Sequence, residues 1–101
     1  MTSARTPLFL MANLGAEVSR IISFTDKNER MRIEDALRRA ERIIVEIKQF
    51  PEMQKRTQEI NALSQAIADI ASSAPTLAID PEHLESYFHP FATRLLKEAH
   101  K

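Results

Sequence analysis

Three histidines, His83, His89 and His100, are the side chains best suited to bind a metal ion or to transfer a proton near neutral pH. Glu85 precedes His89 by four residues, a spacing that places both on one face of a regular helix. A catalytic zinc takes three protein ligands, and this spacing supplies only two. We therefore expect neither a metal site nor a cofactor.

A second pair with chemical potential is Arg94 and His100, which form an Arg-x5-His spacing. The spacing resembles the Arg-x4-6-His motif of the HEPN ribonucleases, small helical bundles in which the arginine and the histidine cooperate at a dimer interface to cleave RNA. Leu95 stands where that family usually has a polar residue. The resemblance implies Arg94 and His100 as candidate catalytic residues of a HEPN-like ribonuclease of a defence or toxin system. This is one alternative to the non-enzymatic function expected below.

The charged stretch between residues 27 and 48 could contact phosphates or a protein partner, above all through Arg38, Arg39 and Arg42. Acidic residues are interleaved at the four-residue spacing of helix ion pairs, which predicts the pairs Glu34–Arg38, Asp35–Arg39 and Arg42–Glu46. Residues 26–50 hold seven basic and six acidic residues, a balance of +1. We expect a solvated face that can dock a partner. A nucleic-acid accessory module that uses the Arg30–Arg42 helix face is a second alternative.

Three of the six aromatic residues, Tyr87, Phe88 and Phe91, lie within five positions. Pro90 stands among them and is expected to disturb helical geometry. Aromatic side chains beside a helix break can line a pocket or form a docking surface. They can equally fill the core while the tyrosine hydroxyl reaches solvent. Both interpretations stay open, and the three residues are interaction candidates.

Four amphipathic segments must position these residues, and apolar periodicity predicts helices over about residues 7–24, 27–50, 51–72 and 81–99. The predicted helix starts are Thr6-Pro7, Asp26 with Glu29 three residues on, Pro51, and Asp80-Pro81. The short connection at Pro51 predicts a helical hairpin, and the last helix is expected to be kinked or broken near Pro90. The predicted fold is all-α, a small antiparallel four-helix bundle that forms a single domain over residues 1–101.

The composition excludes several other classes of protein. The chain has 101 residues, with one glycine and no cysteine. One glycine cannot supply a glycine-rich phosphate loop or several primed hairpin turns. Fourteen basic and fourteen acidic residues cancel, so no net charge attracts nucleic acid or an anionic membrane. The longest apolar run, residues 8–11, is far too short to span a bilayer. We expect a cytoplasmic protein without membrane contact.

The single glycine, Gly15, falls inside the first predicted helix, where glycine costs about 1 kcal/mol relative to alanine. It could be a tolerated surface residue, a local helix break, or a point of close helix approach. Under close approach we expect its neighbour to be the small-residue seam of Ala36 and Ala40, which also lets another helix come near. Only that interpretation predicts that alanine at position 15 destabilises the protein.

Apolar residues on more than one side of a helix indicate surface that a second chain can cover. Val45 follows Ile43 and Ile44 and points about 100° away from Ile44 on the helix. Residues 8–11 likewise cover most of one helical turn. The sequence therefore favours a non-enzymatic helical interaction or adaptor protein that forms a homo-oligomer or binds a helical protein partner. We expect neither nucleic acid nor a small-molecule substrate as its ligand.

Overall fold

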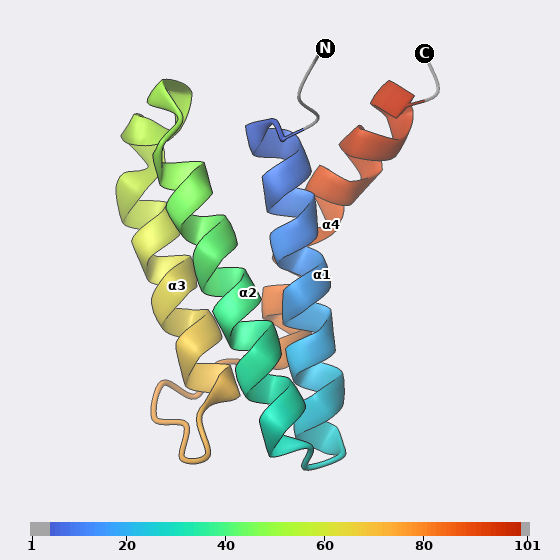
Figure 1. The fold of residues 1–101 in the computed structure, drawn as a ribbon, viewed down its shortest axis with the longest axis vertical. Coiled ribbons are helices and arrows are strands. Elements are labelled where there is room, and N and C mark those ends of the chain that lie inside the picture. The colour runs from blue at the N-terminus through green and yellow to red at the C-terminus, as the bar shows by residue number, and fades with distance from the viewer. Residues whose placement is uncertain (1–4, 100–101) are drawn as a thin grey trace.

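The computed structural model describes residues 5–99, with side chains up to Lys97, and within this range the chain is an all-α bundle (Figure 1). Its elements are α1 (Pro7–Asp26), α2 (Arg30–Lys48), a 3-10 helix η1 (Pro51–Arg56), α3 (Thr57–Ala71) and α4 (Pro81–Ala99). Helix α1 packs against α2 on one side and α4 on the other, and α2 packs against α3. The predicted four-helix bundle is confirmed.

Helix α1 begins where the sequence predicts, but it ends later. The hydroxyl of Thr6 accepts a hydrogen bond from the Phe9 amide at 3.1 Å and caps the first turn. Asp26, expected to cap the second helix, is the last residue of α1, and α2 begins only at Arg30. The cause is Asn28, whose φ of 57° is left-handed. It closes a Schellman turn, in which the amide at position 29 donates to the Phe24 carbonyl at 3.0 Å.

The hairpin of α2 and α3 is confirmed, but the predicted single helix over residues 51–72 is wrong. Phe50 is extended, with a ψ of 127°, because the ring of Pro51 excludes the helical conformation before it. The chain then winds as the 3-10 helix η1, in which the Met53 amide donates to the Phe50 carbonyl at 3.0 Å. Met53 is buried within this tighter winding, and regular α-helix begins at Thr57.

Helix α4 has the predicted bounds, and of the predicted kink or break near Pro90 the break is wrong. A side-chain oxygen of Asp80 accepts from the Glu82 amide at 3.0 Å and caps its start. Pro90 lies inside the helix, which stays helical from Pro81 to Ala99. Pro90 cannot donate to the carbonyl of Ser86 one turn earlier. Both residues are exposed, so water can satisfy that carbonyl and the helix continues.

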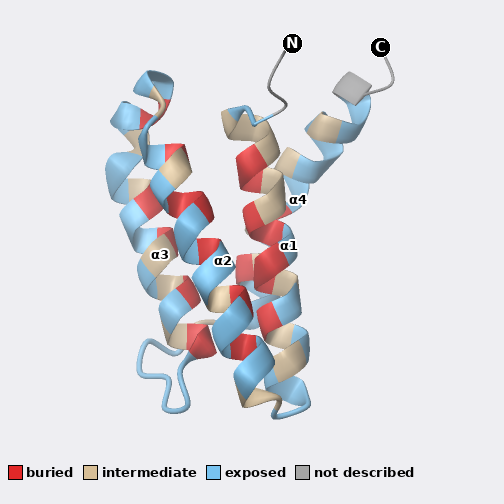
Figure 2. Ribbon diagram, in the orientation of Figure 1, coloured by how far each residue is buried: buried red, intermediate tan, exposed pale blue. Residues whose placement is uncertain are grey.

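One hydrophobic core lies between the helices, on the sides that face one another (Figure 2). Its fully buried large side chains are Leu10, Met11, Leu14, Val18, Ile21, Ile47, Ile60 and Ile67. Ala36 and Ala40 are completely buried on α2, consistent with their expected role as a close-packing seam. Gly15 is also a close-approach point, but its neighbour is Phe88 of α4 and not that seam.

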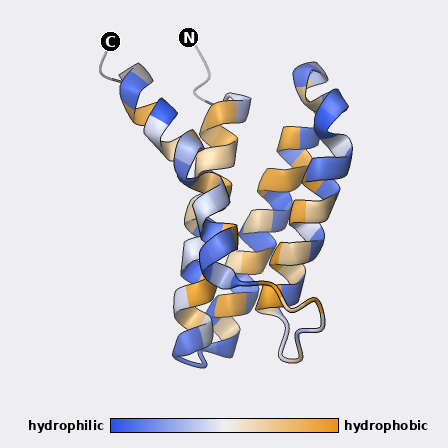
Figure 3. Cartoon of the chain, turned by 180° about the vertical axis from the view of Figure 1, so that it is seen from behind, coloured by the Kyte–Doolittle hydropathy of each residue, from blue (hydrophilic) through white to orange (hydrophobic). Residues whose placement is uncertain are grey.

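Seen from behind, α4 crosses over α1, and the connection from α3 to α4 runs along one end of the bundle (Figure 3). None of the helices within residues 5–99 combines the length and the apolar character needed to cross a membrane.

Candidate functional site

The most exposed apolar side chains of the described helices include two on α2. Met31 is 81% exposed and Val45 is 57% exposed. They are fourteen residues apart with Arg38 midway, so the three lie along one line of the helix. We call this line, with the charged residues 34, 35, 41 and 42 beside it, the outward face of α2. The opposite side carries the buried residues Ile33, Ala36, Ala40, Ile43, Ile44 and Ile47.

The Val45 end of the outward face is hollowed. A shallow groove of about 540 Å³ is lined by Arg38, Glu41, Arg42, Val45 and Glu46. The structure therefore brings together three of the interaction candidates predicted from sequence, Arg38, Arg42 and Val45. Four charged side chains and one apolar side chain, that of Val45, line the groove.

The ion pairs on α2 differ from the three predicted ones. Arg38 pairs with Asp35, one position nearer than the expected Glu34. Glu34 instead meets Arg30 at 3.5 Å. Arg42 takes part in none of the ion pairs within residues 5–99, since its expected partner is held by another segment. The three predicted pairs are therefore wrong. Glu34 and Asp35 pair with other arginines of α2, whereas Arg39 and Glu46 are bound by residues outside the helix.

Arg39 is bound by a residue outside α2, and it does not belong to the outward face. Its Nε lies 3.1 Å from both carboxylate oxygens of Glu17 on α1. Glu17 also meets Arg20 at 3.0 Å. Glu17 is 7% exposed and is the only buried charged residue of the described chain. Arg39, an interaction candidate by sequence, therefore serves to join α1 to α2.

Glu46 at the edge of the groove is bound by Arg5, which precedes α1. The Arg5 Nε donates to one Glu46 oxygen at 2.8 Å and a terminal nitrogen donates to the other at 2.6 Å. These hydrogen bonds to Arg5 favour the charged carboxylate and lower the pKa of Glu46. The segment before α1 is thus fastened beside the outward face of α2.

The aromatic cluster divides between core and surface. Phe88 is 4% exposed, so the option of a docking surface is wrong for this residue. It packs edge-on against Tyr87, with ring centres 5.1 Å apart. Tyr87 and Phe91 are half-buried against the core. All three belong first to the packing of α4.

A polar network joins Tyr87 to the start of α3. The Tyr87 hydroxyl donates to Glu59, and Arg56 donates to the same carboxylate at 2.7 and 3.0 Å. The Arg56 guanidinium also lies 5.9 Å from the centre of the Phe91 ring, within cation–π range. The hydrogen bonds from Arg56 lower the pKa of Glu59, and partial burial opposes them.

Acid should weaken this network. A lowered pKa means that Glu59 stabilises the fold above its unfolded-state pKa, and that this stabilisation is lost as the pH falls through the folded-state pKa. We expect Glu59→Gln to reduce the free energy of unfolding near pH 7 and to have a smaller effect near pH 3. Urea denaturation of both proteins at the two pH values measures this. An equal difference at both pH values would contradict the assignment. Glu52→Gln, on η1, is the control.

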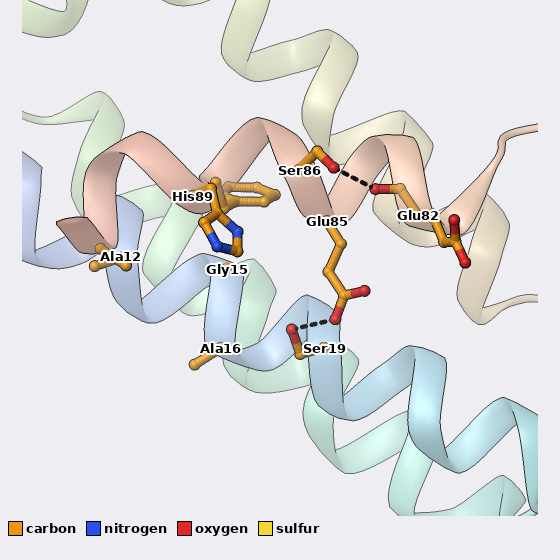
Figure 4. Close-up of a pocket in the computed structure, with 10 residues that line it drawn as sticks. Ala12, Gly15, Ala16, Ser19, Glu82, Glu85, Ser86 and His89 are labelled. Carbon is orange, nitrogen blue, oxygen red and sulfur yellow. Dashed lines mark hydrogen bonds between the residues drawn. The ribbon is translucent and has the colours of Figure 1, made fainter.

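A pocket of about 560 Å³ lies between α1 and α4 (Figure 4). The Ser19 hydroxyl donates to Glu85 at 2.6 Å across it, and His89 extends from α4 toward α1 near Gly15. The serine is bonded to a carboxylate and not to the imidazole, so the nucleophile–base contact of a serine hydrolase is not formed. The bond between Ser19 and Glu85 fastens α4 to α1. This hydrogen bond could not be predicted from the sequence, because Ser19 and Glu85 both stand at positions typical of a helix surface.

The other chemical candidates are separated or lie outside the described chain. Arg94 is exposed on α4, whereas His100 lies outside the described residues, so the Arg-x5-His pair has no geometry here. Among the side chains that the structure describes, no three histidine, aspartate or glutamate residues come together as a set of metal ligands. His83 borders a separate groove between α3 and α4, apart from His89.

Comparison with known proteins adds no information on function. A functional argument therefore rests on the fold and on the outward face of α2. The chain matches no protein-family model, no curated protein and no solved structure.

Proposed function

We propose that the protein is a non-enzymatic helical interaction module that self-associates through the outward face of α2. The observation that carries the proposal is the exposure of Met31 and Val45 on one line of a helix whose opposite side is fully committed to the core. Isolated exposed apolar residues are ordinary on a protein surface. Two on one line, with a groove at one end, form a surface suited to another helix.

The charge on this face supports a protein partner. Four arginines of α2 are already paired with carboxylates: Arg30, Arg32, Arg38 and Arg39. Proteins that bind nucleic acid concentrate unpaired positive charge. We also propose that the protein is cytoplasmic and associates with its helical partner in that compartment.

Sedimentation velocity tests the proposal. We expect the weight-average sedimentation coefficient to rise with concentration up to the high micromolar range. Val45→Glu should remove this rise, because it replaces an apolar side chain of the contact with a charged one. Leu77→Glu is the matched control, since Leu77 is 52% exposed but lies on the connection between α3 and α4. A protein that stays monomeric throughout would overturn the proposal, and so would equal effects of the two substitutions.

A further inference from the structure

A cavity of about 240 Å³ lies where the start of α1, the 3-10 helix η1 and the second half of α4 meet, all at one end of the bundle (Figure 1). None of its lining residues belongs to α2, so the cavity is separate from the outward face. The apolar lining residues are Pro7, Leu8, Met11, Met53 and Phe91. Met11 is 1% exposed and Met53 is 6% exposed, so the core fixes this part of the wall.

Arg56 contributes a guanidinium that its neighbours hold in place. Its Nε and one terminal nitrogen donate to Glu59 at 3.0 and 2.7 Å, and its centre lies 5.9 Å from the centre of the Phe91 ring. Glu59 itself is not among the lining residues. Because an arginine carries five N–H donors, this arrangement leaves donors for a further acceptor. A guanidinium that is already positioned needs little reorganisation to bind an anion.

Arg94 contributes a positive charge that has no ion-pair partner in the described chain. It lines the cavity from α4 and takes part in none of the ion pairs within residues 5–97. Glu52 of η1 also lines the cavity, so two arginines and one glutamate give the lining a formal charge of +1. Helix α1 begins at Pro7, and the positive end of its dipole adds to that charge. The lining therefore favours an anion over a cation.

We propose that this cavity binds a small organic anion with an apolar body, of the class of the short-chain carboxylates. The carboxylate would meet the guanidinium of Arg94, a group whose paired donors match the two oxygens. The apolar body would lie against Met11 and Met53. At about 30 Å³ for each water, the cavity holds about eight water molecules, so a ligand of about eight non-hydrogen atoms, such as hexanoate, fits it.

This proposal departs from the expectation, drawn from the sequence, that a small molecule is not a ligand of the chain. The cavity exists only because the fold brings Leu8, Met53 and Arg94 together from three distant segments. Spacing along the sequence cannot relate such residues to one another. The proposal also stands apart from self-association, which uses a different surface, so either can fail without the other.

A titration of the isotope-labelled full chain with hexanoate, followed by backbone amide resonances, tests the ligand class. We expect saturable shifts at Leu8 and Phe91. Hexanol, which is neutral, should bind more weakly than hexanoate, and the hexylammonium cation should bind more weakly still. Acetate, which has the charge but no apolar body, should also bind more weakly. Salt at about 0.15 M screens the charges that lie far from the cavity.

Three variants test the residues. Arg94→Gln should weaken hexanoate binding by about five- to tenfold, because it removes a charge-assisted contact. Glu52→Gln should strengthen binding, because it removes the one carboxylate of the lining. Lys97→Gln is the matched control and should leave the dissociation constant within about twofold of the parent value. It removes the same charge from the same helix, but Lys97 does not line the cavity.

The opposite order of ligands would overturn the proposal. If hexylammonium binds more tightly than hexanoate, Glu52 governs the cavity and the assigned ligand class is wrong. The proposal also fails if hexanoate produces no saturable shift, or if Arg94→Gln and Lys97→Gln weaken its binding equally. Arg94 is exposed, so its replacement should leave the fold intact and the comparison interpretable.

Discussion

Gly15→Ala should lower the free energy of unfolding by up to about 2 kcal/mol, because overpacking a core costs about 1–3 kcal/mol and alanine returns about 1 kcal/mol in helix propensity. A Cβ at this position would lie 2.6 Å from the Cβ of Phe88 and 2.9 Å from its Cγ. Real Cβ atoms do not approach so closely, and Phe88 is 4% exposed and has little room to move. The steric cost therefore exceeds the gain of about 1 kcal/mol that alanine brings to a helix interior.

Thermal unfolding measures this directly, since 1 kcal/mol corresponds to about 4–8 °C in the melting temperature of a domain of this size. Ala16→Gly, at the neighbouring exposed position, is the control and reports the backbone cost of glycine in the same turn. If Gly15→Ala melts higher than the parent chain, α1 and α4 are not in close contact at this point.

Arg39→Ala should destabilise the protein by about 1–2 kcal/mol, because it leaves the buried carboxylate of Glu17 with Arg20 alone. Removing one partner of a fully buried ion pair typically costs about 3–5 kcal/mol. The expected loss is smaller here because the Arg39 side chain is 44% exposed and Arg20 remains at 3.0 Å. Arg42→Ala removes an unpaired arginine from the same helix and should change the stability of the dilute monomer by less than about 0.5 kcal/mol.

The double variant Glu17→Leu/Arg39→Ala isolates the coupling free energy between Glu17 and Arg39. Glu17→Leu removes the buried charge, and replacing a buried ion by an apolar side chain is often neutral or stabilising. In that background Arg39→Ala should cost much less than it does alone, and urea denaturation of the four proteins gives the coupling free energy. Equal costs in both backgrounds would show that Arg39 acts through packing of its aliphatic stem.

Most of the fold could be predicted from local sequence signals. Thr6, Asp80 and Pro51 mark helix boundaries because their effects act within one turn of the chain. The prediction failed at the turn between α1 and α2, where Asp26 resembled a cap. The decisive residue was Asn28, whose left-handed backbone closes the Schellman turn. Asparagine sometimes takes this position in place of glycine, so the signal was available.

The candidate site was predictable only in part. The exposure of Val45 followed from helix periodicity, and Met31, on the same line seven residues before Arg38, could have been found in the same way. The partners of Arg39 and Glu46 could not be predicted, because Glu17 and Arg5 come from distant parts of the sequence. Spacing along one helix gives no information about which neighbouring segment reaches a given charge.

The hydrogen bond between Tyr87 and Glu59 gives the chain a built-in optical reporter. Tyr87 is the only tyrosine, and the sequence has no tryptophan to mask its emission. All tyrosine fluorescence of the protein therefore originates where α4 meets the start of α3, beside Arg56. Tyrosine fluorescence can therefore follow the detachment of α4 from α3 without an added label. Circular dichroism, in contrast, reports the helix content of the whole bundle.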